Sequence, residues 1–590
     1  MTTTTPTPDK QTGMALSYVG TLVGESTSRE FRIAVKQEAV REQDIIAVDA
    51  EMSDPANPST STQQIRIWAK VQRVERINPL FPLEAGHELA ETQTDPFDTV
   101  LSLSREMVTA VCQVLGAEPL TGGRGGKLDQ LRYPAKPATR AYRPTSNDIA
   151  RVVLGELGQK ANRALDIATL SNRPEVDVKI DGHAIVTRHL AILAMTGAGK
   201  SVTARRIIEQ LATKNYPTVI FDPHGDYTGL ADVQSLKGKV KRFYAQLPIF
   251  EEAPEKVAGI VESLGWPLSD NQRLHFDALF KGAKSFMQAD NADELKQRRD
   301  WLADYIGDGQ IKTYGLQPNL YFFANFVQAV VKAGKDNDQP AFTQLQNWTD
   351  QDYGRVISRQ VAGWVEGVIG RLRTAAKSIR RMEEISRKIA RQAEPLPQDR
   401  TELVQYGQVS IISLAGYTGE FQATIYSIIA SDIFDARVRN TLKLPALFLL
   451  EEAHNFVPGK ATSGAEERSI AITKQIAQEG RKFGVGLILI SQRPSRLDET
   501  ALAMCNSYII MRMVNPADQN FVRKVVESLG EDDAAMLPNL DVGEALLSGQ
   551  IINFPVLVKI KESESKGEHE EEDAFKLLEE ANRQIKNPGR

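Results

Sequence analysis

The feature that most constrains this chain is the octapeptide AMTGAGKS at residues 194–201. The apolar run HLAILAM leads into it and the amphipathic run SVTARRIIEQLATK leaves it, which predicts a loop between a buried strand and a helix. Glycines in such a loop let backbone N–H groups surround a phosphate, and the helix adds its positive dipole end. The octapeptide therefore predicts a P-loop that holds the phosphates of ATP.

Each residue type in this loop has its own expected role toward the nucleotide. Lys200 is expected to place its charge on the β- and γ-phosphates, and the Ser201 hydroxyl is expected to bind Mg²⁺. The usual motif opens with glycine, whereas this chain has Ala194, so the loop needs support from its surroundings. The residues expected to contact the nucleotide are Thr196, Gly197, Ala198, Gly199, Lys200, Ser201 and Val202.

A pair of acids follows the apolar run ALFLL and supplies the second half of a hydrolytic site. Glu451 stands where an acid organises Mg²⁺, and Glu452 stands where a base orients the attacking water. Aspartate is usual at the first position, but the longer Glu451 side chain still allows a water-mediated contact with the metal. A surface turn with two solvated acids is the alternative, and the occurrence of both half-motifs within one α/β pattern disfavours it.

Two more strand ends are expected at the same edge of the sheet, where ligands of such sheets bind. Asp222 ends the strand PTVIFDP and is expected to support Mg²⁺ or the attacking water. Gln492 follows GLILIS and is expected to sense the γ-phosphate, whereas a strand-end turn is the favoured interpretation of Ser491. His224 fits a functional role and a structural loop role equally well.

The order of strand-like and helix-like runs predicts several domains, as 590 residues are too many for one core. Short alternating runs predict a small N-terminal β-barrel or sandwich, followed by a helix at 97–117 and a helix cap at Ser146 or Asn147. Apolar strands alternating with helices then predict a parallel α/β sheet. The predicted parts are a disordered tail (1–14), the barrel (15–145), the core (146–250 and 405–555), an inserted helical subdomain (251–404) and an acidic tail (556–590).

Composition disfavours several other classes of protein. A net charge of −5 gives no overall attraction to nucleic acid, so any DNA contact needs local basic patches. The two cysteines, Cys112 and Cys505, lack metal-ligand spacing and fit a reducing cytoplasm. We expect no membrane segment, because no apolar run is long enough and the start of the chain lacks a signal-peptide pattern.

Together these segments resemble the HerA family, hexameric DNA-translocating ATPases of the RecA-like, FtsK-related group. The resemblance covers roughly 180–555 and implies a RecA-like core, an N-terminal HAS-barrel, an inserted helical bundle and a C-terminal brace. The runs that carry it are LAMTGAGKS, IFDPHGDY, FLLEEAHNF, IAQEGRKFGVGLILISQRP, CNSYIIMRMVNPADQ and LPNLDVGEALLSG.

The resemblance implies a ring of six subunits with ATP between neighbours. Arg481 is expected to be an arginine finger, since a guanidinium suits phosphate oxygens better than the amine of Lys482 does. Arg188 matches a second family arginine near the nucleotide; for both arginines a surface ion pair is the alternative. Lys460, in the loop 458–469, is a candidate DNA contact in the channel. For the basic run 370–392, a solvated helix face is favoured over DNA binding.

The leading hypothesis is therefore an ATP-driven translocase or helicase that acts on double-stranded DNA. The resemblance implies a separate partner, either a NurA-like nuclease in DNA-end processing or a nuclease or sirtuin-like effector in anti-phage defence. Two alternatives stay open: a ring scaffold that assembles an effector complex, and a secretion or conjugation ATPase. The N-terminal β-rich unit and the lack of a membrane segment favour the HerA type over the second alternative.

Overall fold

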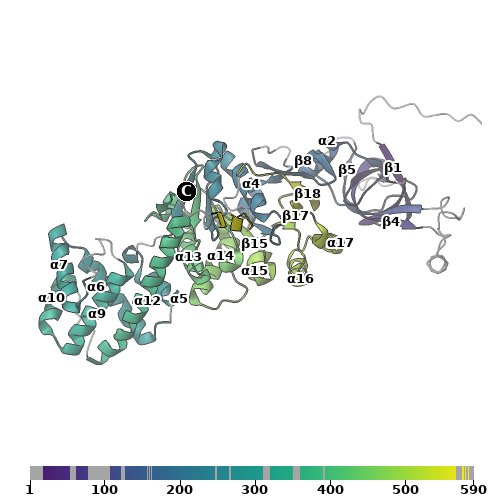
Figure 1. Cartoon of the computed structure of the whole chain (residues 1–590). Helices are drawn as coiled ribbons and strands as arrows, with labels where there is room; N and C mark the ends of the chain where they lie inside the picture. The colour runs from purple at the N-terminus through teal and green to yellow at the C-terminus, as the bar shows by residue number, and fades with distance from the viewer. Residues whose placement is uncertain are drawn as a thin grey trace, which may run out of the picture. The chain divides into compact units, whose positions relative to one another are not determined.

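The computed structural model divides the chain into two compact units (Figure 1). The first unit comprises residues 1–184, 195–199 and 507–562, and the second comprises 185–194, 200–506 and 563–590. Within these units, the structure describes residues 17–36, 38–53, 62–77, 107–120, 126–155, 157, 160, 162–245, 249–264, 267–309, 319–349, 359–389, 392–565, 575, 576, 578, 579, 582 and 583.

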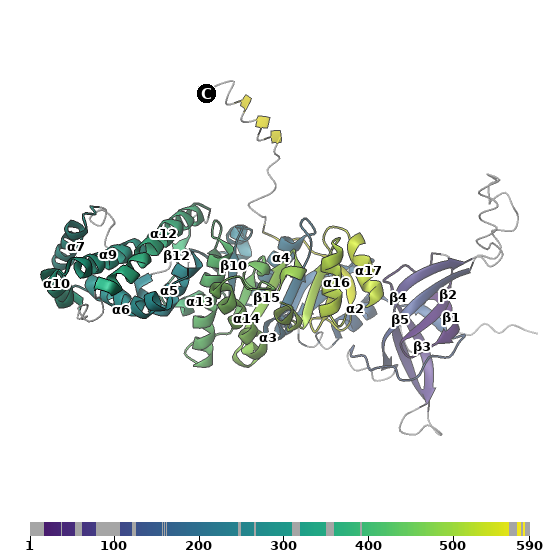
Figure 2. The same ribbon diagram turned by 90° about the horizontal axis from the view of Figure 1, so that it is seen from below.

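The first unit contains a closed barrel of six antiparallel strands in the order β1-β2-β5-β4-β3-β6 (Figure 2). Buried and exposed residues alternate in β2, so that Phe31 and Ile33 point into the barrel core. The predicted N-terminal β-barrel is thus confirmed. Its strands are β1 (Ser17–Ser26), β2 (Glu30–Val35), β3 (Ile45–Ser53), β4 (Thr62–Ile77), β5 (Met107–Pro119) and β6 (Arg140–Arg143).

Two local predictions around the barrel are wrong. Residues 107–117 of the expected helix lie in β5, which pairs with β2 and β4 on its two sides; residues 97–106 lie outside the described residues. The valines and threonine of this run suit a strand that closes a barrel. Helix α2 (Ser146–Leu154) is capped by Thr145, whose hydroxyl accepts the Asp148 N–H, because the backbone is still extended at Thr145.

The first unit also contains an antiparallel sheet, with neighbours in the order β16-β17-β18-β7-β8. The expectation that the run VDVKI, which lies in β8, belongs to a parallel sheet is therefore wrong. Only Ser171 and Asn172 separate β7 from β8, too few residues for the crossover that a parallel pair needs. The elements are β7 (Ala164–Leu170), β8 (Arg173–Asp181), β16 (Ser507–Met511), β17 (Glu544–Gly549), β18 (Val556–Ile560), α16 (Pro516–Val525) and α17 (Glu531–Met536).

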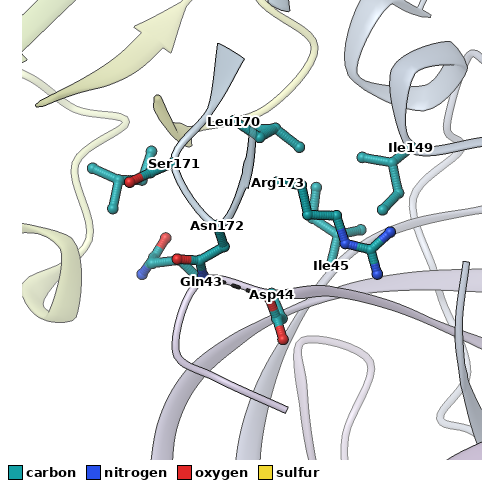
Figure 3. Close-up of a pocket in the computed structure, with 9 residues that line it drawn as sticks. Gln43, Asp44, Ile45, Ile149, Leu170, Ser171, Asn172 and Arg173 are labelled. Carbon is teal, nitrogen blue, oxygen red and sulfur yellow. Dashed lines mark hydrogen bonds between the residues drawn. The ribbon is translucent and has the colours of Figure 1, made fainter. Parts of the chain in front are cut away.

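Polar contacts tie the barrel to this sheet inside the first unit. The β7–β8 turn places Asn172 beside Gln43 and Asp44 of a barrel loop (Figure 3), and its amide donates to the Glu42 carbonyl over 2.6 Å. On β4 the buried Lys70 ammonium pairs with Asp533 of α17 over 2.8 Å. A buried charge that lost its partner would be costly, so this ion pair fixes the barrel against α17.

The second unit is built on a parallel sheet in the order β12-β11-β13-β10-β14-β15-β9. Every residue of β9, β10, β13, β14 and β15 is buried, as expected for a sheet covered on both faces. The carboxyl ends of these strands therefore meet at one edge. The strands are β9 (Leu190–Leu193), β10 (Thr218–Asp222), β11 (Val240–Tyr244), β12 (Glu394–Pro395), β13 (Val409–Ser413), β14 (Ala446–Leu450) and β15 (Val485–Ser491).

Helices surround this sheet (Figure 1). In the sequence, a group of helices lies between β11 and β12. Phenylalanines form the core of the group; the rings of Phe276 and Phe323, for example, lie 5.3 Å apart. None of the described helices combines the length and apolarity of a membrane span. The group contains α5 (Pro254–Ser263), α6 (Asp270–Met287), α7 (Ala292–Ile306), α9 (Leu320–Asp336), α10 (Gln339–Thr349) and α12 (Arg359–Ile389). Near the site lie α3 (Gly182–Arg188), α4 (Lys200–Thr213), α13 (Gly419–Val438) and α14 (Gly464–Phe483).

Candidate nucleotide site

The loop between β9 and α4 has the backbone that phosphate binding requires. Gly197 and Gly199 adopt φ values of +79° and +105°, a region that residues with a side chain rarely enter. A Cβ on Gly199 would lie 3.1 Å from the Met511 side chain, whereas one on Gly197 would meet no atom within 4 Å. The loop is thus closely packed at Gly199 and has free space beside Gly197.

The Lys200 ammonium lies between the two acids that follow β14. Its Nζ donates to Glu451 Oε1 and, over 2.8 Å, to Glu452 Oε1. All three side chains are buried, with exposed fractions of 7% for Lys200, 0% for Glu451 and 4% for Glu452. One positive charge between two carboxylates leaves a surplus of negative charge, which favours the arrival of a cation.

The two acids have opposite pKa shifts. Burial raises the pKa of Glu451 above its ordinary value, and the Lys200 charge offsets this only in part. Burial also acts to raise the pKa of Glu452, but the charge and hydrogen bond of Lys200 outweigh it and hold the pKa below its ordinary value. Glu452 is therefore the carboxylate that stays ionised, as a base near neutral pH must.

The surroundings of Glu452 leave one of its oxygens available. Gln492 donates its side-chain N–H to Oε1, while Oε2 has no hydrogen-bond donor among the described residues. His454 Nδ1 lies 3.3 Å from Oε2, and burial lowers the pKa of His454 although the Glu452 charge acts to raise it. Gln492 extends from β15, the strand between β14 and the P-loop strand β9. A buried acceptor oxygen without a donor suits a water molecule that is to be activated.

Asp222 at the end of β10 holds the loop that follows it. Its Oδ1 accepts the N–H groups of His224, Gly225 and Asp226 over 2.8–3.2 Å, and its Oδ2 accepts that of Tyr227 over 3.2 Å. Burial raises the pKa of Asp222 to about 6. With both oxygens engaged, Asp222 organises this loop in the described state, instead of reaching a metal or water as its sequence position indicated.

The loop held by Asp222 brings two residues to the site that sequence reasoning missed. The fully buried Tyr227 hydroxyl donates to Glu451 Oε2, and Ser201 Oγ lies 3.3 Å from Asp226 Oδ2. Both residues stand in the run FDPHGDY, beyond the strand that drew attention to Asp222. The sequence did contain a signal for Asp226: it is an acid that directly follows Gly225, in the turn after the carboxyl end of a strand.

The structure leaves three residues of the predicted set without contact to this cluster. Arg481 is exposed in the last turn of α14, and no hydrogen bond or ion pair of its side chain occurs among the described residues. Arg188 is half-buried at the end of α3. Lys460 is exposed in a loop whose start is fixed, since the Gly459 N–H donates to the Arg496 carbonyl over 2.7 Å.

The side chains present fit Mg²⁺ bound together with a nucleotide. The described residues contain no group of three or more His, Cys, Asp or Glu placed to hold a metal. Mg²⁺ usually needs only one or two carboxylates because substrate phosphates and waters complete its shell. Ser201, Asp226 and the surplus carboxylate charge beside Lys200 supply that kind of partial site.

The pKa of Asp222 gives a test of its burial. Because burial raises this pKa from 3.8 to about 6, the folded chain holds the proton more tightly than the unfolded chain, so stability falls as pH rises through this window. Relative to Asp222→Asn, which does not titrate, the wild type should lose about 3 kcal/mol of unfolding free energy as the pH rises from about 3 to about 7, with little change above. Urea unfolding at a series of pH values measures this difference; a constant difference would contradict the assignment.

Comparisons with known proteins show similarity to helicases. Residues 165–433 match the family model described as the central domain of helicase HerA, a region that includes the P-loop and Asp222 and ends before Glu451. A DNA double-strand break repair helicase HerA of Pyrococcus furiosus is 29% identical over 467 residues, covering 77% of this chain and 78% of that protein. A probable helicase of Methanocaldococcus jannaschii is 25% identical over 553 residues, covering 92% and 95%.

Among solved structures, VirB4 of Thermoanaerobacter pseudethanolicus aligns with 67% of this chain and 96% of its own, at 14% identity and a TM-score of 0.41. This similarity is too distant to bear on function. Over residues 165–433 the chain is similar to the central domain of helicase HerA, and relatives named HerA are 27–29% identical to it.

Proposed function

We propose that this protein is an ATP-driven translocase of double-stranded DNA that works as a homohexameric ring. The observation that carries the proposal is the buried cluster of Lys200, Glu451 and Glu452 at the carboxyl edge of the parallel sheet. Curated relatives in this family are named DNA double-strand break repair helicases, which supports DNA as the substrate.

In the proposed reaction, ATP binds along the 196–202 loop, and Lys200 moves from its carboxylates to the β- and γ-phosphates. Ser201 and Glu451 would hold Mg²⁺, which neutralises charge on the phosphates when bound. Glu452 keeps its ionised carboxylate and its free Oε2, so it orients the attacking water and accepts its proton. Gln492, hydrogen-bonded to Glu452, links this water to the end of β15.

A neighbouring subunit completes the proposed site. Arg481 is exposed and contacts no member of the cluster in its own chain, so it is available to the γ-phosphate bound by the next subunit, with Arg188 as a second cation near the nucleotide. A guanidinium at this point stabilises the charge that builds up during phosphoryl transfer. Hydrolysis then depends on ring assembly.

The remaining parts of the proposal concern DNA and partners. Duplex DNA would pass through the central channel, where the exposed Lys460 contacts backbone phosphates without reading sequence. A separate nuclease or defence effector in the cytoplasm would act on the DNA that the ring delivers. The proposal includes a HAS-barrel at 15–145, an inserted helical bundle at 251–404 and a C-terminal brace after 556, as the resemblance implies.

Substitution of Glu452 tests hydrolysis and translocation together. Glu452→Gln keeps the size of the side chain but removes the base, so ATP binding should persist while the hydrolysis rate falls about 10²- to 10⁴-fold. Displacement of a triplex-forming strand from duplex DNA should be lost in parallel. The exposed Glu402→Gln, in the same unit, is the matched control and should keep wild-type rates.

Two results would count against the proposal. Near-wild-type hydrolysis by Glu452→Gln would remove Glu452 from its role as the base. A wild-type ring that hydrolyses ATP but never displaces the triplex strand would favour the scaffold alternative over a motor.

Subunit mixing tests the role of Arg481 across the interface. Arg481→Ala should bind ATP normally but fail to hydrolyse it, because the missing charge acts on a neighbour's nucleotide. Rings mixed from Arg481→Ala and Glu452→Gln subunits should regain part of the activity, since some interfaces then combine an intact Glu452 with an intact Arg481. Lys482→Ala, at the adjacent exposed residue, should change little. Mixed rings as inactive as the separate variants would show that Arg481 does not act in trans.

A further inference from the structure

The Ser201 hydroxyl, which is expected to bind Mg²⁺, contacts an acid that the sequence did not point to, Asp226 in the loop after β10. Ser201 Oγ lies 3.3 Å from Asp226 Oδ2, and this contact joins the start of α4 to the loop after β10. In the described residues the Ser201 hydroxyl makes this contact and none with Glu451. The short, half-buried side chain of Asp226 therefore occupies the position next to Ser201 where an acid can help to hold a metal.

Glu451 is committed elsewhere in the same site. Its Oε1 accepts from Lys200 and its Oε2 accepts from Tyr227, and its side chain is fully buried. Tyr227 is also fully buried, so it holds Glu451 on the Lys200 side of the cluster. To reach a metal at Ser201, Glu451 would have to leave both partners.

The loop that carries Asp226 is held firmly in place. Four backbone N–H bonds to Asp222 fold it, and the Thr228 hydroxyl donates to the Gly225 carbonyl over 2.9 Å. The buried Arg205 of α4 donates to the Asp226 carbonyl over 3.3 Å. These contacts fix the Asp226 backbone against the P-loop helix and leave its carboxylate directed to Ser201, the kind of support that a metal ligand needs.

We propose that Asp226 acts with Ser201 to hold the Mg²⁺ of the bound nucleotide, directly or through one of the metal's waters. The inference rests on the proposed ATPase function and deepens it by naming a second acid at the metal. This role of Asp226 also explains why the acid at the end of β14 is Glu451 and not the usual aspartate. The aspartate that helps to hold Mg²⁺ comes from the loop after β10 instead. Asp226 thus joins Glu451 at the metal, and Glu451 is the charge partner of Lys200 until the nucleotide binds.

The test measures how much Mg²⁺ tightens nucleotide binding, with no need for hydrolysis. A fluorescent ADP analogue is titrated into the full chain in Mg²⁺ and in EDTA, and the ratio of the two affinities is the Mg²⁺ gain. Asp226→Asn should retain the affinity measured in EDTA but lose about tenfold or more of the Mg²⁺ gain. Asp232→Asn, an exposed aspartate six residues further on, should keep the wild-type gain.

A second variant separates a direct role from an indirect one. Ser201→Ala should lose a comparable part of the Mg²⁺ gain, and the double variant should lose little more than either single variant if both residues hold one ion. The assignment would be overturned if the double variant lost as much Mg²⁺ gain as the two single variants together. It would also be overturned if Asp226→Asn kept the full Mg²⁺ gain. Loss of Mg²⁺-free ADP binding in Asp226→Asn would overturn it too, because Asp226 would then be a structural residue of the loop. If the wild type binds no ADP under either condition, the ATPase proposal itself fails.

Discussion

The ion cluster of Lys200 with Glu451 and Glu452 is the interaction on which the rest of the site depends. The three charges are buried together, and each carboxylate lies about 250 residues from the lysine in sequence, at separations of 251 and 252. Removing Lys200 would leave two buried carboxylates without their counterion, which typically costs several kcal/mol. The parallel sheet is what makes the cluster possible, because it brings the ends of β14 and β15 to the edge where α4 begins.

The same cluster explains why nucleotide binding can drive motion. Without phosphates, Lys200 satisfies the two acids; with phosphates, it has a competing set of anionic partners, and the acids need a new cation. Tyr227 and Gln492 hold one acid each, so a change at Lys200 reaches both the loop after β10 and the end of β15. Since Arg481 contacts none of these groups in its own chain, the proposed cycle requires neighbouring subunits.

Short motifs and the alternation of strand-like and helix-like runs predicted the main architecture, because both signals are local in the sequence. The P-loop, the acidic pair and the barrel strands are each encoded in runs of a few residues, and the structure contains the strands, loop and helix that these runs indicate. Failures arose where the outcome depends on partners distant in sequence. The run at 107–117 becomes β5 because β2 and β4 flank it, and periodicity alone could not reveal those neighbours. Asp226 and Tyr227 were missed because Asp222 folds their loop toward Ser201 and Glu451.

The steady-state rate of ATP hydrolysis, measured with and without blunt-ended duplex DNA, tests the central claim most directly. If the Lys200 cluster forms the ATP-hydrolysing site of a DNA translocase, duplex DNA should raise the rate, and Lys200→Ala should abolish hydrolysis under both conditions. An active wild type whose rate is the same with and without duplex DNA would contradict the account.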